Sequence, residues 1–479
     1  MIQRLFTLLF LLQIAMISPQ SYAETAVSEK AGLSAKADKL QALSKNAPRK
    51  QTDADSQNSP SGWVKKHPDK IPATITPESD ENVEYEESEE KEPEEPEESV
   101  ETDEVENIEN PVQVDEDEVE DTEEASDIAV FSLPNLGDWQ PFVEMDANLF
   151  PSFLISTSIL KLDPPETQDP TFIGDRSGLA GIAIRNPAKN TRVRLEIKES
   201  MIMHAARLDA VLEKENEIYV LCPASSFKFD VMIKQKQPLP NSLIFSVSIN
   251  SQEPVTKVKN VLIRSINDCP TFYVSQTDNS HADISFMFAA YVNESHPMID
   301  RILQDALKTR IVKGFTGYQS EDGNEVINQV FAIWTALQKK GIKYSSITTP
   351  SAYSENVFAQ NVRFIEESLN FTQANCVDGC VLIASILYKI GINPFLVLVP
   401  GHMYLGFYLD ENSENICLLE TTMLAEGKGE DFFHEVLKES LEEYEKNEEK
   451  FLADNDPDYQ IIDIDEARRV GIVPIAFSR

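Results

Sequence analysis

The sequence predicts an α+β domain that is preceded by an all-β sandwich and a long acidic linker. The segment Asp80–Asp127 contains 26 acidic residues and a single lysine. Short alternating apolar runs follow it up to about residue 274, and from about residue 275 apolar residues recur with helical spacing before short apolar strands return. The expected parts are a signal peptide at 1–23, a linker at 24–127, a β-sandwich at 128–274 and an α+β domain at 275–479.

The first residues have the pattern of a secretory signal peptide. Arg4 precedes the apolar run Leu5–Ile17, which is too short to be a stable membrane anchor, and Ser21-Tyr22-Ala23 is a small-x-small cleavage signal. We therefore expect cleavage after Ala23 and a secreted or periplasmic protein. No later apolar run has membrane-spanning length, so we expect no transmembrane anchor in the mature chain.

The net charge of −39 is concentrated in one segment. Asp80–Asp127 supplies −25 of it, with Lys91 as its one base, and is nearly free of aromatic residues. Such a segment buries too little apolar surface to offset the entropy of folding, and its self-repulsion favours an extended chain. We interpret 24–127 as a disordered spacer; loose binding of cations or of a basic partner is the alternative. Nucleic-acid binding has no basic patch in the sequence to support it.

The segment 128–274 shows the alternation of apolar and polar residues that is typical of half-buried strands. Its runs are separated by turns that contain proline or asparagine, which predicts an antiparallel sandwich of immunoglobulin-like kind. We expect this domain to position the next one or to widen its substrate surface, and His204 to be structural. The runs are Val193–Ile197, Ile218–Cys222, Phe227–Ile233, Ile244–Ile249 and Val261–Ile263.

Helices are predicted at the start of the α+β domain. Asn293–Pro297 is a helix-start signature with His296 as the capping residue. The predicted elements before the central motif are helices at Ile299–Val312, Val326–Leu337 and Val357–Leu369 and a strand at Ile342–Ile347. Those after the motif are a charged helix at Glu430–Leu452 and a strand at Tyr459–Ile464.

The central motif carries the candidate chemistry. An apolar run predicts a buried helix over Asp378–Ile390 with Cys376 at its N-terminus, where unpaired N–H groups and the helix dipole favour a thiolate. His402 opens a predicted strand after a Pro-Gly turn, and Glu420 ends another. A thiol, an imidazole and a carboxylate in this arrangement are typical of nucleophilic catalysis, in which the imidazole takes the thiol proton and the acid orients the imidazole.

This stretch resembles the transglutaminase-like superfamily. The motif of that family is a Cys that opens a helix with an Asp two residues later, a Gly-Ile-x-Pro-like turn, a His that begins a strand, and an acid before Thr. The matching residues are, in order, Cys376, Asp378, Gly391-Ile392, His402 and Glu420-Thr421.

The resemblance covers roughly residue 289 to the C-terminus. It implies a papain-like α+β fold in which Cys376 is the nucleophile, His402 the base and Glu420 the orienting acid. Many members have Asp as the third residue and His-Ala-Trp around the histidine, whereas this chain has Glu420 and His402-Met403-Tyr404. Gln373 is a candidate for stabilising an oxyanion, and Asp378 is the other oxyanion or second-shell candidate.

Other roles for the cysteines stay open. The chain has five, an odd number for an exported protein, so at least one is expected to be free. Cys380 is expected to be a small buried hydrophobe, although a disulfide with Cys376, or a metal site of both with His402, is an alternative. Cys222 and Cys269 could be bridged.

The predicted function is an exported, cysteine-dependent acyl-transfer enzyme. It would act on peptide or side-chain amides through a thioester, most simply by hydrolysis. The alternatives are a crosslinking enzyme of the same fold and a non-catalytic binding module. We expect a protein or peptide substrate, no cofactor, no metal and a monomeric chain.

Overall fold

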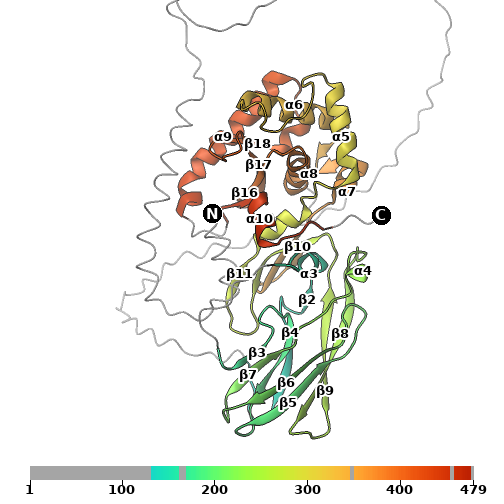
Figure 1. Ribbon diagram of the computed structural model, residues 1–479, viewed down its shortest axis with the longest axis vertical. Coiled ribbons are helices and arrows are strands. Elements are labelled where there is room, and N and C mark those ends of the chain that lie inside the picture. Colours follow the sequence, from blue (N-terminus) through green and yellow to red (C-terminus); the bar gives the residue numbers. More distant parts are fainter. Residues whose placement is uncertain (1–130, 161–168, 346–349, 454–457, 476–479) are drawn as a thin grey trace, which may run out of the picture. The chain divides into compact units, whose positions relative to one another are not determined.

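The computed structural model describes residues 131–160, 169–345, 350–453 and 458–475. Within them the fold is mixed α and β, with strands in five sheets, and the long helices lie in the second half (Figure 1). The predicted signal peptide and the predicted linker lie outside the described residues, so the structure says nothing of either.

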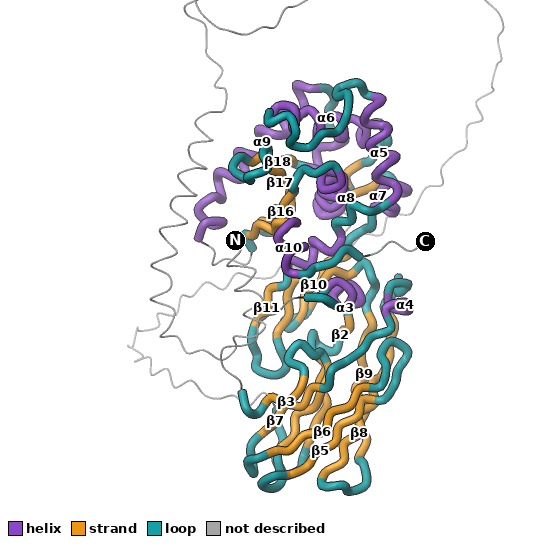
Figure 2. Tube along the Cα trace, viewed as in Figure 1, coloured by secondary structure: helices purple, strands orange, loops and turns teal. Residues whose placement is uncertain are grey.

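Two sheets form the first half of the described chain, as the strands in Figure 2 show. Their facing side chains share one apolar cluster, to which Ile182 contributes from one sheet and Leu195 and Phe245 from the other. The strands β3 and β7 are parallel, as are β2 and β9, so the prediction of a wholly antiparallel arrangement is wrong at these two pairs. The first sheet has the order β1 (Trp139–Val143), β4 (Ala180–Arg185), β7 (Ile218–Cys222), β3 (Phe172–Gly174). The second has the order β2 (Asn148–Leu149), β9 (Val255–Ile263), β8 (Leu239–Ile249), β5 (Thr191–Ile197), β6 (Ala206–Leu212).

The run Phe227–Ile233 is not a strand. It holds the short helix α4 (Phe229–Met232), in which Met232 is buried whereas Phe229 is 40% exposed. The alternating apolar residues therefore do not share one buried face. A second short helix, α3 (Pro151–Ser156), packs into the same half of the chain.

A third sheet joins residues on both sides of the predicted domain boundary. Its strand β10 (Asp268–Val274) ends the segment that was predicted to be the sandwich, yet it pairs with β11 (His281–Asp283) and with β14 (Val357–Asn361). The fourth strand is β13 (Pro350–Tyr353). The described residues on both sides of this boundary also belong to one compact unit.

The predicted helix over Val357–Leu369 is wrong in its first half. Residues Val357–Asn361 form β14, in which Val357 and Ala359 are buried against the sheet. The helix α7 (Ile365–Phe371) starts only after Phe364, where the Glu367 carboxylate accepts the Phe364 N–H at 2.9 Å. Pairing with β10, about 90 residues earlier in the chain, has overridden the local helical spacing.

The other predicted helices and strands of this half occur in the predicted order, whereas β15 (Gln373–Ala374), α10 (Ile464–Val470) and two 3₁₀ helices were not predicted. Helix α5 begins after His296, whose Nδ1 accepts the Met298 N–H at 3.3 Å, so the predicted cap is confirmed. Its bounds and those of the next elements are α5 (Pro297–Lys308), α6 (Gly323–Lys339), β12 (Lys343–Tyr344), β15 (Gln373–Ala374), α8 (Cys376–Lys389), α9 (Glu430–Ala453) and α10 (Ile464–Val470). Two 3₁₀ helices, η2 (Ser285–Tyr291) and η3 (Thr421–Ala425), complete this half.

A four-stranded antiparallel sheet lies at the centre of this half. One face packs on α8, and the other carries a separate apolar cluster that it shares with α9, including Tyr404 and Tyr444 (Figure 1). The order is β18 (Ile416–Leu419), β17 (His402–Tyr408), β16 (Pro394–Val399), β19 (Gln460–Asp463). Among the described residues, we find no helix with the length and apolar character that a membrane crossing requires.

Gly406 in β17 provides a test of this packing. A Cβ at this position would overlap the ring of Phe395, its partner across the β16–β17 pair, which is 2% exposed. We expect Gly406→Ala to lower the free energy of unfolding in urea by about 1–3 kcal/mol through overpacking. Gly314→Ala, where the new methyl group meets nothing within 4 Å, should change it by less than about 0.5 kcal/mol. Equal effects of the two substitutions would contradict this packing.

Candidate functional site

Cys376 is the first residue of α8, as predicted. The preceding Asn375 caps the helix, because its side chain accepts the Asp378 N–H at 2.7 Å while the Asp378 carboxylate accepts the Asn375 N–H at 3.0 Å. This reciprocal pair fixes the first turn. Cys376 itself is half-buried, so its thiol lies at the positive end of the helix dipole and at the edge of the apolar core.

Asp378 fixes the position of this helix start from the protein interior. It is fully buried, and Arg363 donates to it twice, from its backbone N–H at 2.8 Å and from its guanidinium at 2.7 Å. Burial raises the pKa of Asp378, although the hydrogen bonds from Asn375 and Arg363 oppose that shift. Its carboxylate is therefore engaged with the backbone and with Arg363, and it supports the helix start that carries Cys376.

His402 occupies the first position of β17, directly after the turn from β16. Its Nε2 lies 2.6 Å from Oε2 of Glu420, and its ring also interacts with the Cys376 thiol. These interactions, with the thiol first and the carboxylate second, raise the pKa of His402 to about 10 although burial acts in the opposite direction. Since Nε2 faces Glu420, Nδ1 is the nitrogen left for the thiol.

Glu420 directly follows β18, caps the 3₁₀ helix η3, and uses both carboxylate oxygens. Oε2 meets His402, and Oε1 accepts the Thr422 N–H at 2.9 Å and the Thr422 hydroxyl at 2.6 Å. Burial alone would raise the pKa of Glu420, but the interactions with His402 and Thr422 outweigh it and lower the pKa. The longer side chain of a glutamate thus reaches the imidazole and remains ionised there.

Three neighbouring residues, for which the sequence predicts no role, complete the site. Thr421 donates its hydroxyl to the Cys376 carbonyl at 3.4 Å, and Arg363 anchors Asp378. The pKa of Tyr344 is raised by burial and further by the charges of Cys376 and Glu420, so its phenol lies near both. Thr421 follows the motif acid directly, which is a usable signal, whereas Arg363 and Tyr344 have no local sequence pattern that marks them.

Gln373 lies apart from the hydrogen bonds described above. It is exposed on β15, where it pairs with Lys343 of β12. Its part in stabilising an oxyanion therefore stays a prediction.

All five cysteines are free thiols. The two possible disulfides, Cys376–Cys380 and Cys222–Cys269, are not formed. Cys380 is buried, with its thiol 3.6 Å from the Met403 carbonyl oxygen, as expected of a small hydrophobe. Burial raises the pKa of Cys222 and of Cys417 to about 12 and that of Cys380 well above the usual value.

Nothing in the described ranges gathers three or more His, Cys, Asp or Glu side chains in a geometry fit for a metal ion. Comparisons with family models, with curated proteins and with solved structures gave no match in any of the three. The geometry of Cys376, His402 and Glu420 and the motif resemblance are therefore the two grounds for a functional proposal.

The His402–Glu420 pair predicts a pH-dependent contribution to stability. Because the pKa of His402 is raised from 6.5 to about 10 in the folded chain, its contribution is complete below about pH 6.5 and is lost as the pH rises through 10. In urea titrations at pH 6, 8 and 10, wild type should therefore lose its stability advantage over His402→Gln as the pH increases. His434→Gln, at an exposed position on α9, is the matched control for the loss of an imidazole. An advantage that grows from pH 6 to pH 10 would contradict the pairing.

The same geometry predicts that Cys376 is the most reactive thiol. A cationic His402 beside the sulfur favours the thiolate, which is the species that alkylates. We expect iodoacetamide to modify Cys376 before the other four cysteines, as followed by peptide mass spectrometry from pH 6 to 9. His402→Ala should slow its modification at pH 7 about tenfold or more. Cys417, partly exposed but with its pKa raised to about 12, is the internal control. A Cys376 that reacts no faster than Cys417, or is indifferent to His402, would refute the ion pair.

Proposed function

We propose that this protein is a cysteine-dependent acyl-transfer enzyme that cleaves peptide or side-chain amides through a thioester. The observation that carries the proposal is the alignment of three groups. A half-buried thiol at a helix N-terminus meets an imidazole whose far nitrogen lies 2.6 Å from a carboxylate. A nucleophile, a base and a group that orients the base are the parts that covalent acyl transfer needs.

The chemistry would run in two halves. The Cys376 thiolate attacks the amide carbonyl carbon, and the tetrahedral intermediate collapses to a thioester as His402 gives its proton to the leaving amine. Neutral His402 then takes a proton from water, the resulting hydroxide attacks the thioester carbon, and the carboxylic acid leaves as the thiolate is regenerated with His402 again cationic.

The electrostatics of the site favour this cycle. With its pKa raised to about 10, His402 is cationic at neutral pH in the resting enzyme. It can therefore donate the proton that the leaving amine needs. Glu420 stays ionised because its pKa is lowered, and it stabilises that cation. Its hydrogen bonds to Thr422 hold the carboxylate in one orientation.

We also propose a fold family for each half of the described chain. A cysteine-bearing helix that packs on an antiparallel sheet with the histidine at a strand start agrees with the papain-like layout of the transglutaminase-like superfamily. The two facing sheets before it support an immunoglobulin-like sandwich. We further propose export, on the signal-peptide pattern of the first 23 residues. We propose hydrolysis rather than crosslinking because the thiol and the imidazole are only partly buried, so water can reach them.

Activity on amides tests the proposal. Full-length protein is incubated with a peptide library, and products are identified by mass spectrometry. Cys376→Ala should lower the rate at least about a thousandfold, and Glu420→Gln about a hundredfold or more, because the imidazole loses its orienting charge. Cys417→Ala, which removes the other partly exposed thiol, should retain the wild-type rate.

Two results would count against the proposal. Retention of cleavage by Cys376→Ala would assign the activity to another group. An absence of cleavage by wild type, together with an unreactive Cys376, would favour a non-catalytic binding module that uses the same fold.

A further inference from the structure

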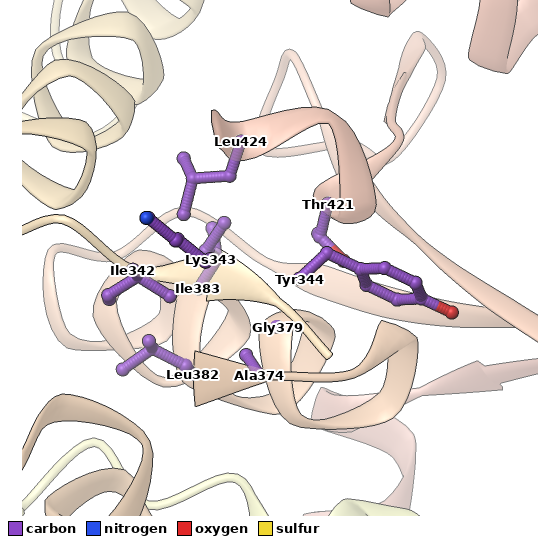
Figure 3. A pocket seen from close by; sticks show the side chains of 9 residues that line it. All are labelled: Ile342, Lys343, Tyr344, Ala374, Gly379, Leu382, Ile383, Thr421 and Leu424. Carbon is purple, nitrogen blue, oxygen red and sulfur yellow. The ribbon is translucent and has the colours of Figure 1, made fainter. Parts of the chain in front are cut away.

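A small hollow lies beside the start of α8, between that helix, strand β12 and the 3₁₀ helix η3. Figure 3 shows Leu424 and Thr421 of η3 on one side of it and Ala374 and Leu382 on the other, with β12 between them. It contains none of the three triad side chains, and the mechanism above does not use it.

Three residues that line the hollow lie near Cys376. Gly379 lies three residues after Cys376 on the same face of α8, which is roughly 4.5 Å along the helix axis. Thr421, another lining residue, donates to the Cys376 carbonyl at 3.4 Å. Tyr344, also in the lining, has a phenol close enough to Cys376 and Glu420 for their charges to affect it. A substrate carbonyl attacked by Cys376 would therefore have its acyl-side substituent next to this hollow.

The residues that line the hollow favour an apolar substituent of the substrate. Four of the nine lining residues are buried aliphatic side chains: Ile342, Leu382, Ile383 and Leu424. The polar groups of the lining come from Thr421, Lys343 and Tyr344. The hydroxyl of Thr421 bonds to the backbone, and Figure 3 shows Tyr344 and Lys343 pointing in opposite directions along β12. A charged group in this space would lose its hydration without a partner.

The size of the hollow limits that group further. It offers space for about one water-sized group, which is close to the volume of a methyl group. The hollow is closed off at Gly379, where Thr421 packs so tightly that an added Cβ would lie 2.7 Å from its hydroxyl. A large aliphatic or aromatic side chain would have to displace Leu424 or Ile342.

We propose that this hollow is the acyl-side pocket of the enzyme and that it selects amides whose acyl residue carries a small aliphatic side chain, as alanine does. The inference rests on the proposed function, since it presumes attack by Cys376. It adds the substrate class, and it names Leu424 and Ile342 as the residues that set the size limit.

N-acetyl amino aldehydes test the pocket without a known substrate. The Cys376 thiolate adds to the aldehyde carbon and the oxygen takes a proton, so a thiohemiacetal forms with no leaving group. Binding of acetyl-alaninal, acetyl-leucinal and acetyl-phenylalaninal to the full chain is measured by protection of Cys376 against iodoacetamide. Wild type should bind the alaninal at least about tenfold more tightly than the other two.

Enlarging the pocket should reverse this order. Leu424→Ala, and independently Ile342→Ala from the opposite wall, should shift the preference toward the leucinal by about tenfold or more. Leu437→Ala is the matched control. It removes the same atoms from a similarly buried leucine on α9, outside the hollow, and should leave the order unchanged.

The outcomes separate the two proposals. If Cys376 forms adducts but wild type prefers the phenylalaninal, or if both enlarged variants keep the wild-type order, the pocket assignment is wrong and the acyl-transfer proposal survives. If no aldehyde protects Cys376 and its alkylation does not depend on His402, both proposals fail together.

Discussion

The contact of 2.6 Å between Glu420 and His402 is the constraint on which the geometry of the site depends. It joins the start of β17 to the end of β18, and it holds only if both strands keep their register. The β16–β17 turn sets the first position, and the hydrogen bonds from Thr422 to Glu420 set the second. With the imidazole held in this way, the geometry of the site depends on the position of the first turn of α8. That turn carries Cys376, whose thiol must lie on the side of the ring that is opposite Glu420.

A buried charge fixes that helix start. Asp378 is fully buried, and an isolated carboxylate there would be strongly destabilising. Arg363 and the Asn375 N–H satisfy it, so the ion pair ties the segment before α7 to the first turn of α8. Removal of one partner from a buried pair typically costs about 3–5 kcal/mol, because the other charge is left uncompensated. The pair therefore does more to specify where Cys376 lies than to add net stability, since its desolvation offsets much of its attraction.

The parts of this structure that could be predicted from the sequence are those that local spacing determines. The helix that starts at Cys376 and the three strands after it have apolar runs and turn residues within a few positions of one another. The strand at Val357–Asn361 was assigned to a helix because its partner, β10, lies far back in the chain. Likewise, Arg363 and Tyr344 join the site only through the fold. Their residue types and neighbours in the sequence do not distinguish them from other surface side chains.

The distribution of the thiols gives an independent physical argument about the site. If the chain is exported, as we propose, its five free cysteines enter an environment that favours oxidation. Cys222, Cys269 and Cys380 are inaccessible to oxidants, and burial raises the pKa of each, so that their thiolates are rare. Cys417 has some exposure, but burial raises its pKa to about 12 as well. Cys376 differs from all four because it combines partial exposure with a helix N-terminus and a cationic neighbour. Four of the thiols are therefore poorly reactive, and the fifth lies beside the imidazole that pairs with Glu420. Efficient packing alone does not require this difference.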